Sequence, residues 1–266
     1  MREAMAALLG AVQGFTEFLP VSSSGHLVLA ERILGVTLPG VAFEVTVHVA
    51  SLCAVLWAYR ARIHELVRGV CRRERESLTY AGLLGLATVP AGVVGLVWES
   101  ALEGLFDVPR LAAALLLASG LLAWSVKRSA PAAQAGRPDA PRALGIGMAQ
   151  AVAIIPGVSR SGATLAVGSW LGVDAVRMAE FSFLMSVPAI AGAAVLQVGE
   201  FGAAVNDIGP GFLLTGFATA LVSGIVAIRI FVRMLEHRTF HRFAYYCWSV
   251  GLGYLVAAAF LPGLRG

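Results

Sequence analysis

Six long apolar runs constrain the fold of this 266-residue chain more than any other feature of its sequence. They cover residues 41–59, 78–98, 111–126, 181–198, 211–228 and 243–261. Most approach the roughly 20 apolar residues that a helix needs to cross the hydrocarbon layer of a membrane. Charged residues make up only 14% of the chain, whereas typical soluble domains carry about 25%. The sequence therefore predicts an all-α polytopic membrane protein.

The charge of the connections between these runs predicts their orientation. Of the 20 Lys and Arg residues, 14 fall in three connections: 60–77, 127–142 and 229–242. The connections 99–110 and 199–210 are mainly acidic. Because cytoplasmic loops of membrane proteins are enriched in Lys and Arg, we expect the three basic connections on the cytoplasmic side of the plasma membrane. The net charge of +4 then needs no nucleic-acid partner.

Two further apolar stretches, residues 4–36 and 143–172, are interrupted by proline and by clusters of serine and glycine. A proline inside a helix removes a backbone donor and clashes with the preceding turn, so neither stretch is expected to form one continuous helix. The orientation of the flanking connections requires each stretch to enter and leave on the same side. We therefore expect two re-entrant helical hairpins, whose irregular backbone is buried in protein or faces water.

A weak internal repeat relates the two interrupted stretches, since residues 13–25 resemble residues 150–162. Each half then contains one hairpin and three transmembrane helices, and an odd number of spans inverts the second half relative to the first. We predict a single membrane domain with repeat one at 1–126, a linker at 127–142 and repeat two at 143–266. In such inverted-topology repeats the binding site lies at the repeat interface, near the midplane.

The first interrupted stretch carries a cluster of polar side chains: Gln13, Glu17, Ser22, Ser23, Ser24 and His26. Gln13 and Glu17 lie four residues apart and share one helix face. An ionisable group inside a membrane segment marks a functional site by default, although a Glu near a helix end can also reach the interface. The serines can be N-caps, yet a Ser beside a His is also the minimal activated nucleophile. For Glu44, which is alone in an apolar run, a functional role and a structural role are equally expected. In the structural role, its hydrogen-bond partner is His48, one turn later.

The second interrupted stretch contains Arg160. A guanidinium at membrane depth needs an anionic partner, and its planar fork matches phosphate oxygens. The alternative partner is a protein carboxylate such as Glu17 or Glu180. Hydroxyl side chains flank this arginine: Ser159, Ser161 and Thr164. No nucleotide-binding motif accompanies the cluster, so the residues favour phosphate chemistry without a nucleotide.

Two motifs resemble those of a known family. Residues 13–26, QGFTEFLPVSSSGH, resemble the [E/Q]xxxE…PVSS-x-GH signature of the bacterial undecaprenyl-diphosphate phosphatases of the bacitracin-resistance type. Residues 156–164, PGVSRSGAT, resemble that family's PGxSRSxxT motif, and residues 180–188 resemble a further segment. The resemblance implies hydrolysis of undecaprenyl diphosphate to undecaprenyl phosphate and phosphate, which recycles the carrier lipid for cell-wall synthesis. It also implies a divalent cation, Mg²⁺ or Ca²⁺.

Motif positions assign the expected roles. The catalytic residues are expected to be Glu17, Ser23, His26 and Arg160. The substrate-binding residues are expected to be Gln13, Ser22, Ser24, Ser159, Ser161 and Thr164. Gln13 and Glu17 are expected to hold the metal, although a glutamine cannot act as a base.

Two mechanisms and one other class of function stay open at this point. Ser23 attacks the terminal phosphorus while His26 or Glu17 accepts its proton, or a water activated by Glu17 or His26 attacks directly. A lipid flippase or secondary transporter for a phosphorylated substrate is the alternative, because inverted repeats are a transporter architecture. The expected partners are a polyprenyl diphosphate lipid and the bilayer, and a homodimer is compatible with the sequence.

Overall fold

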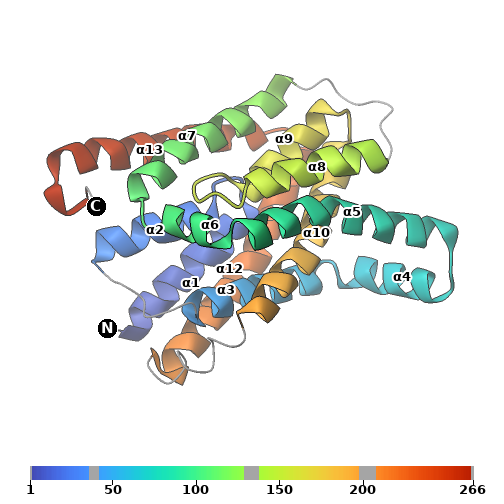
Figure 1. Cartoon of the computed structure of the whole chain (residues 1–266), viewed down its shortest axis with the longest axis horizontal. Helices are drawn as coiled ribbons and strands as arrows, with labels where there is room; N and C mark the ends of the chain where they lie inside the picture. The colour runs from blue at the N-terminus through green and yellow to red at the C-terminus, as the bar shows by residue number, and fades with distance from the viewer. Residues whose placement is uncertain (1, 36–41, 129–137, 198–207, 265–266) are drawn as a thin grey trace.

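The computed structural model describes residues 2–35, 42–128, 138–197 and 208–264. All regular elements within these residues are helices, and no strand occurs among them (Figure 1). In chain order the α-helices are α1 (Arg2–Phe18), α2 (Ser23–Leu34), α3 (Ala42–Ala58), α4 (Arg60–Cys71), α5 (Arg75–Val97), α6 (Glu99–Phe106), α7 (Pro109–Ser125), α8 (Ala140–Val152), α9 (Arg160–Trp170), α10 (Ala175–Leu196), α12 (Pro210–Glu236) and α13 (Phe243–Phe260). In Figure 1 both chain ends lie on the left, and the turn between α4 and α5 lies at the right edge. The predicted all-α fold is confirmed.

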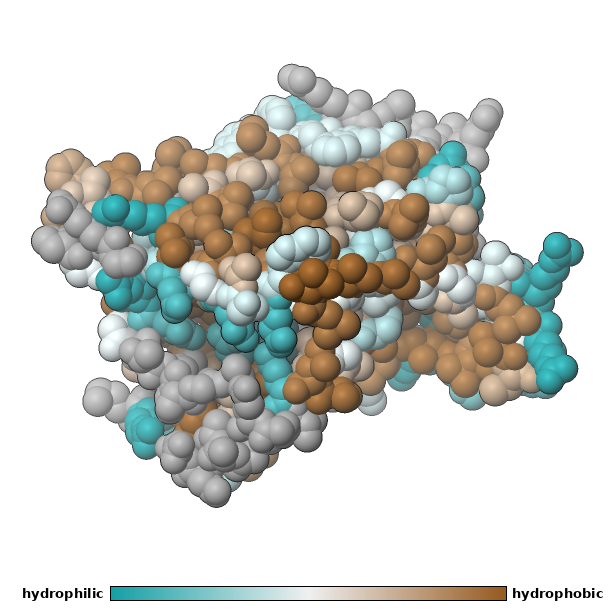
Figure 2. All heavy atoms as spheres, in the orientation of Figure 1, coloured by the Kyte–Doolittle hydropathy of each residue, from teal (hydrophilic) through white to brown (hydrophobic). Residues whose placement is uncertain are grey.

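The described helices supply four to six of the six predicted spans. Within the described residues, α5, α10, α12 and the segment Phe240–Phe260 are each long and apolar enough to cross a membrane. Two bent helix pairs pass the same test only when each pair is taken together: α3 meets α4 at 77° and α6 meets α7 at 95°, and each pair is either a broken span or a re-entrant loop. Apolar side chains cover much of the face in Figure 2, while hydrophilic ones cover the turn between α4 and α5. The chain is therefore a multi-pass membrane protein.

The basic connection 60–77 is itself helical, because it forms α4 and the start of α5. Arg, Glu and Leu are good helix formers, and one face of α4 packs on α5 while the arginines stay accessible. Two predicted connections fall partly outside the described residues: the linker 127–142 at 129–137, and the connection 199–210 at 199–207.

Both interrupted stretches are helix–break–helix units. The first consists of α1 and α2, the second of α8 and α9, and in each unit the two helices pack against each other. α1 packs along α12, and α8 packs along α5, so each unit lies against a helix from the other half of the chain. The inverted orientation of the two halves stays a prediction.

The two breaks touch each other, and two glycines make this approach feasible. Gly157 has a φ of 96°, a backbone conformation that favours glycine. A Cβ atom on Gly157 would collide with the backbone carbonyl of Ala112. A Cβ atom on Gly25 would lie 2.9 Å from the Cα of Gly157. The irregular backbone of each break is thus buried against the other break.

Two serines tie the breaks together. Ser22 Oγ accepts hydrogen bonds from the backbone N–H of Gly157 at 3.2 Å and of Gly25 at 3.3 Å. Ser161 Oγ donates to the backbone oxygen of Leu19 at 3.1 Å. Backbone groups that leave the helical ladder must find other partners in a membrane, and these contacts supply some of them. The same contacts bring the starts of α2 and α9 to one place.

Candidate active site

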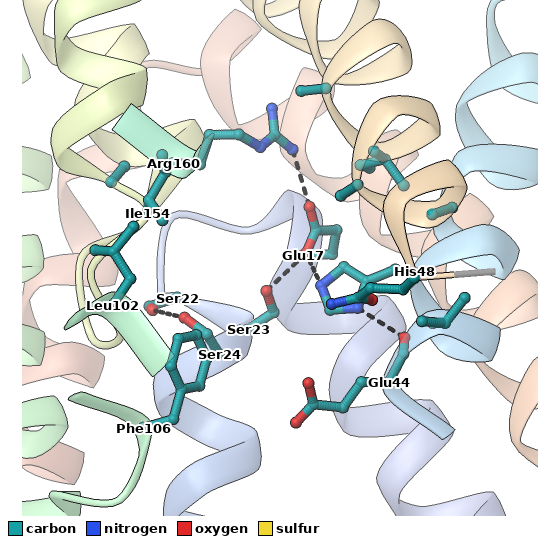
Figure 3. A pocket seen from close by; sticks show the side chains of 18 of the residues that line it. Glu17, Ser22, Ser23, Ser24, Glu44, His48, Leu102, Phe106, Ile154 and Arg160 are labelled. Carbon is teal, nitrogen blue, oxygen red and sulfur yellow. Dashed lines mark hydrogen bonds and ion pairs between the residues drawn. The ribbon is translucent and has the colours of Figure 1, made fainter. Parts of the chain in front are cut away.

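A cavity of about 390 Å³ lies where the two breaks meet (Figure 3). Its polar wall is built from both hairpins, α3 and α6, and includes Glu17, Ser22, Ser23, Ser24, Glu44, His48, Glu99, Glu103, Ser159 and Arg160. Its apolar wall comes mainly from α6, the break before α9, and α10, and includes Leu102, Phe106, Ile154, Val158 and Ile190. One cavity therefore combines ionisable groups with an apolar lining, as a site for an amphiphilic ligand requires.

Glu17 is at the centre of the polar contacts. Its Oε2 accepts a hydrogen bond from Ser23 Oγ at 2.6 Å and from Gln13 Nε2 at 3.1 Å. Its Oε1 accepts from Arg160 Nη2 at 3.2 Å. The carboxylate is only 8% exposed, and a buried charge needs such partners to be tolerated. The predicted residues Gln13, Glu17, Ser23 and Arg160 thus form one connected group, in which three partners surround the carboxylate.

Of the two carboxylates expected from the sequence as partners, Glu17 and Glu180, Arg160 pairs with Glu17. Besides Glu17, it donates from Nη1 to the backbone oxygen of Ser182 at 3.2 Å. Glu180 instead accepts a hydrogen bond from Arg62 Nε at 2.9 Å. Arg160 is the first residue of α9, so its side chain leaves from a helix start directly into the cavity.

His48 faces Glu17, a contact that the sequence analysis missed. Its Nε2 lies 3.9 Å from Glu17 Oε2. Its Nδ1 lies 2.8 Å from the backbone oxygen of Glu44. The expected hydrogen bond within α3 is therefore made to the main chain of Glu44 and not to its carboxylate. Because a carbonyl can only accept, Nδ1 carries the proton, and Nε2 is turned toward the cavity. The spacing along α3 predicts the contact within the helix but not the neighbour on α1.

His26 lies away from the cavity. Its Nδ1 is 2.8 Å from the backbone oxygen of Ser22, and its Nε2 is 3.0 Å from the hydroxyl of Tyr246. Its ring stacks on that of Tyr246, with ring centroids 5.6 Å apart. The structure does not bring His26 to Ser23; among the described residues, the hydroxyl of Ser23 donates its hydrogen bond to Glu17.

Two helix starts point at the cavity. Ser22 caps α2, and Ser159 Oγ caps α9 by accepting from Gly162 N at 3.1 Å. The first backbone N–H groups of a helix carry positive partial charge, which favours an anion. The amide of Ser159 is itself occupied, because it donates to Ser119 Oγ at 2.8 Å, and that hydroxyl donates to the oxygen of Gly157. Ser119, on α7, is a structural residue that the motif analysis missed.

The remaining predicted residues divide into two groups. Ser24 lines the cavity beside Ser22. Thr164 lies behind Arg160, where its hydroxyl donates to the backbone oxygen of Arg160 and contacts Ser182 Oγ, each at 2.8 Å. Ser161 lies between the two breaks, and neither Ser161 nor Thr164 lines the cavity among the described residues. These two hydroxyls therefore position the site and do not face it.

The oxygen donors that a divalent cation would use at this site belong to Gln13 and Glu17. Among the described residues there is no group of three or more His, Cys, Asp or Glu side chains placed to hold a metal ion. Gln13 Oε1, however, is buried with no hydrogen-bond partner in the described structure, and its own amide group contacts Glu17. Mg²⁺ commonly takes one or two protein oxygens and completes its shell with water and substrate phosphate. Gln13 and Glu17 suit that kind of site.

The fold and the cavity define a polytopic membrane protein with a buried carboxylate–arginine–serine site at two helix starts. The chain belongs to the family described as bacitracin resistance protein BacA, whose model matches residues 6–253. It is 38% identical to a protein from Methanobrevibacter smithii, over 93% of this chain and 94% of the relative. A relative from Syntrophotalea carbinolica is 39% identical, over 92% and 95%, and one from Bordetella pertussis is 35% identical, over 95% of each chain. All three relatives carry the name undecaprenyl-diphosphatase.

Proposed function

We propose that this protein hydrolyses undecaprenyl diphosphate to undecaprenyl phosphate and inorganic phosphate, and so recycles the carrier lipid for cell-wall synthesis. The observation that carries the proposal is the placement of Glu17, Ser23 and Arg160 around one cavity at the starts of α2 and α9. Family membership over residues 6–253 and relatives named undecaprenyl-diphosphatase support the same activity.

Binding of the diphosphate starts with an exchange of partners at Arg160. Its guanidinium is paired with Glu17, and phosphate oxygens offer a second, bidentate partner. The positive ends of α2 and α9 add to the attraction. The apolar wall that contains Leu102 and Phe106 lies beside these groups and receives the first prenyl units (Figure 3).

The chemical step follows from the hydrogen bond between Ser23 and Glu17. Ser23 Oγ bonds to the terminal phosphorus and gives its proton to Glu17 Oε2, its partner at 2.6 Å. The bond from that phosphorus to the bridging oxygen breaks, and undecaprenyl phosphate leaves. Water then hydrolyses the phosphoserine. Gln13 orients Glu17, and Arg160 neutralises the charge on the phosphoryl oxygens, which is the main demand of a loose phosphoryl transition state.

A divalent cation completes this proposal, with Gln13 and Glu17 as its protein ligands. When bound, Mg²⁺ or Ca²⁺ would neutralise phosphate charge. We expect purified protein to release phosphate from undecaprenyl diphosphate in detergent with Mg²⁺ or Ca²⁺, and the rate to fall at least about 100-fold with a chelator.

Gln13→Ala should raise the cation concentration for half-maximal rate by at least about ten-fold.

The matched control is Gln150→Ala, because Gln150 is a buried glutamine at the corresponding position of the second hairpin, and its amide, unlike that of Gln13, makes no hydrogen bond to Glu17 in the described structure. This variant should keep the cation dependence of the wild type. Unchanged phosphate release in the presence of a chelator would overturn the proposed requirement for a divalent cation. No release with any cation would overturn the proposed phosphatase activity itself.

The orientation proposed for the chain places its basic connections in the cytoplasm. Residues of all three basic connections line neighbouring grooves at one end: Arg60 and Arg229 line one, Arg62 and Pro138 another. The catalytic cavity is lined instead by Glu99 and Glu103 of an acidic connection. The positive-inside rule therefore favours a cavity that opens on the outer side of the plasma membrane.

Cys71 offers a test of this orientation, because it is exposed at the end of α4. In intact bacteria that produce the protein with Cys53 and Cys247 replaced by alanine, Cys71 should react with a membrane-impermeant maleimide only after permeabilisation. A cysteine placed at the exposed Glu103 of the same background should react in intact cells. Labelling of Cys71 from outside would reverse the proposed orientation.

A further inference from the structure

A second groove, with a volume of about 500 Å³, lies between α12, the bend from α3 to α4, and the start of α10. None of its lining residues also lines the catalytic cavity. α10 connects the two, since Val176 and Glu180 at its start line the groove while Ile190 lines the cavity. The groove is therefore a separate feature at the basic end of the protein, and the proposed phosphatase reaction does not use it.

Three arginines give the groove its charge. Arg229 and Arg233 lie one turn apart on α12, so they share a helix face. Arg60 faces them from α4. Both α12 arginines are exposed, and neither makes an ion pair among the described residues. Of the two glutamates in the lining, Glu180 is already paired with Arg62, which leaves a single unpaired carboxylate on Glu236.

The 77° bend between α3 and α4 holds Arg60 at the edge of the groove. Its Nη1 donates to the backbone oxygen of Trp57 at 2.9 Å, and its guanidinium carbon lies 4.8 Å from the centroid of the Trp57 ring. Trp57 is 56% exposed, and exposed tryptophans are typical of the interface between hydrocarbon and headgroups. The exposed Trp57 therefore favours a position of the groove near the headgroup layer.

Along α12 the lining begins with apolar side chains and then becomes mixed, with Val232 between Arg229 and Arg233. On α12 the lining begins with Ile225 and Ile228 and ends with Arg233 and Glu236. From Ile225 to Arg233 the helix rises about 12 Å. An apolar floor that leads into a pair of unpaired arginines matches a molecule with hydrocarbon chains and an anionic head, whereas a free anion would make no use of the apolar half.

We propose that this groove binds the phosphate headgroup of an anionic two-chain phospholipid from the bilayer, with Arg229, Arg233 and Arg60 around the phosphate and Ile225, Ile228 and Val232 along the acyl chains. Basic pockets between transmembrane helices on the cytoplasmic side are suited to anionic headgroups, and each arginine near the surface contributes about five-fold in affinity.

The test is the affinity of detergent-purified protein for phosphatidylglycerol and for phosphatidylcholine with the same acyl chains, measured by native mass spectrometry. The wild type should prefer phosphatidylglycerol at least ten-fold. Arg229→Gln with Arg233→Gln should weaken phosphatidylglycerol binding about 30-fold, from the loss of two arginine contributions, and leave phosphatidylcholine unchanged. Glycerol phosphate, which has the head without the chains, should not compete at concentrations near those of the lipid.

The matched control is Arg68→Gln with Arg72→Gln, which removes the same charge from exposed positions at the same end but outside the groove. It should change phosphatidylglycerol affinity less than two-fold. An equal loss in the control would show a diffuse surface charge, and competition by glycerol phosphate would show a free-anion site; either result overturns the proposal. Should the double variant fail to fold, Val232→Trp, which fills the groove and keeps the arginines, decides alone: unchanged affinity overturns the proposal.

Discussion

Replacement of Arg160 by alanine should reduce phosphate release from undecaprenyl diphosphate at least about 1,000-fold. The variant loses the guanidinium that faces the phosphoryl oxygens in the proposed complex, and it leaves the carboxylate of Glu17 without its ion-pair partner at 3.2 Å. Arg160→Lys should recover only part of the rate, because an ammonium keeps the charge but not the planar fork. Steady-state kinetics of the purified variants measure both effects.

A matched arginine separates catalysis from general electrostatics. Arg62 also pairs with a glutamate, Glu180, at 2.9 Å, but at the other end of the protein. Arg62→Ala should therefore stay within about three-fold of the wild-type rate, as expected for a partly exposed pair that contributes little. An Arg160→Ala enzyme within ten-fold of the wild type would remove this residue from the proposed site.

A double variant tests whether the loss at Arg160 is merely structural. Removal of one partner from a buried pair leaves an uncompensated charge and costs about 3–5 kcal/mol of stability, whereas removal of both charges is often nearly neutral. Arg160→Ala with Glu17→Gln should therefore unfold at a higher temperature than Arg160→Ala alone. Its activity should stay abolished, because the double variant also lacks the acceptor for the proton of Ser23.

The sequence predicts the helical membrane fold and the breaks between α1 and α2 and between α8 and α9, because these depend on local physics. The length of an apolar run sets a span, and Pro20 or Pro156 within a run sets a break. The pairing of Arg160 with Glu17 was also accessible, since a guanidinium in the membrane needs a nearby anion. The sequence analysis assigned no helix to the basic segment 60–77, although arginine and glutamate are good helix formers.

The contacts that complete the site depend on packing between distant segments. His26 was expected at Ser23, three residues away, but its ring packs on Tyr246, which is 220 residues further along the chain. Ser23 and His26 both belong to α2, and side chains three residues apart share one face of a helix. The direction in which each side chain points is fixed only by tertiary contacts such as that of His26 with Tyr246 on α13. His48 faces Glu17 for the same kind of reason, and no spacing rule relates α3 to α1.

Replacement of Ser23 by alanine is expected to abolish turnover and to remove a trapped phosphoserine. The hydroxyl is 2.6 Å from Glu17 Oε2, so it is already polarised toward its proton acceptor, and covalent catalysis splits one displacement into two easier steps. We expect Ser23→Ala to lose at least about 1,000-fold in rate while the KM changes little, because Arg160 and the helix starts still hold the diphosphate. Acid quench of the wild type with substrate labelled at the terminal phosphate should place the label on the peptide that contains Ser23.

The neighbouring serines provide the controls, since Ser22 and Ser24 also line the cavity. Ser24→Ala should keep most of the activity, because its hydroxyl contacts Ser22 and not Glu17. The competing mechanism, in which Glu17 or His48 activates a water, gives the opposite pattern: Ser23→Ala stays active and no label remains on the protein. Because Ser23 then serves only as a hydrogen-bond partner of Glu17, its loss would cost about ten-fold, and a rate measurement alone distinguishes the two mechanisms.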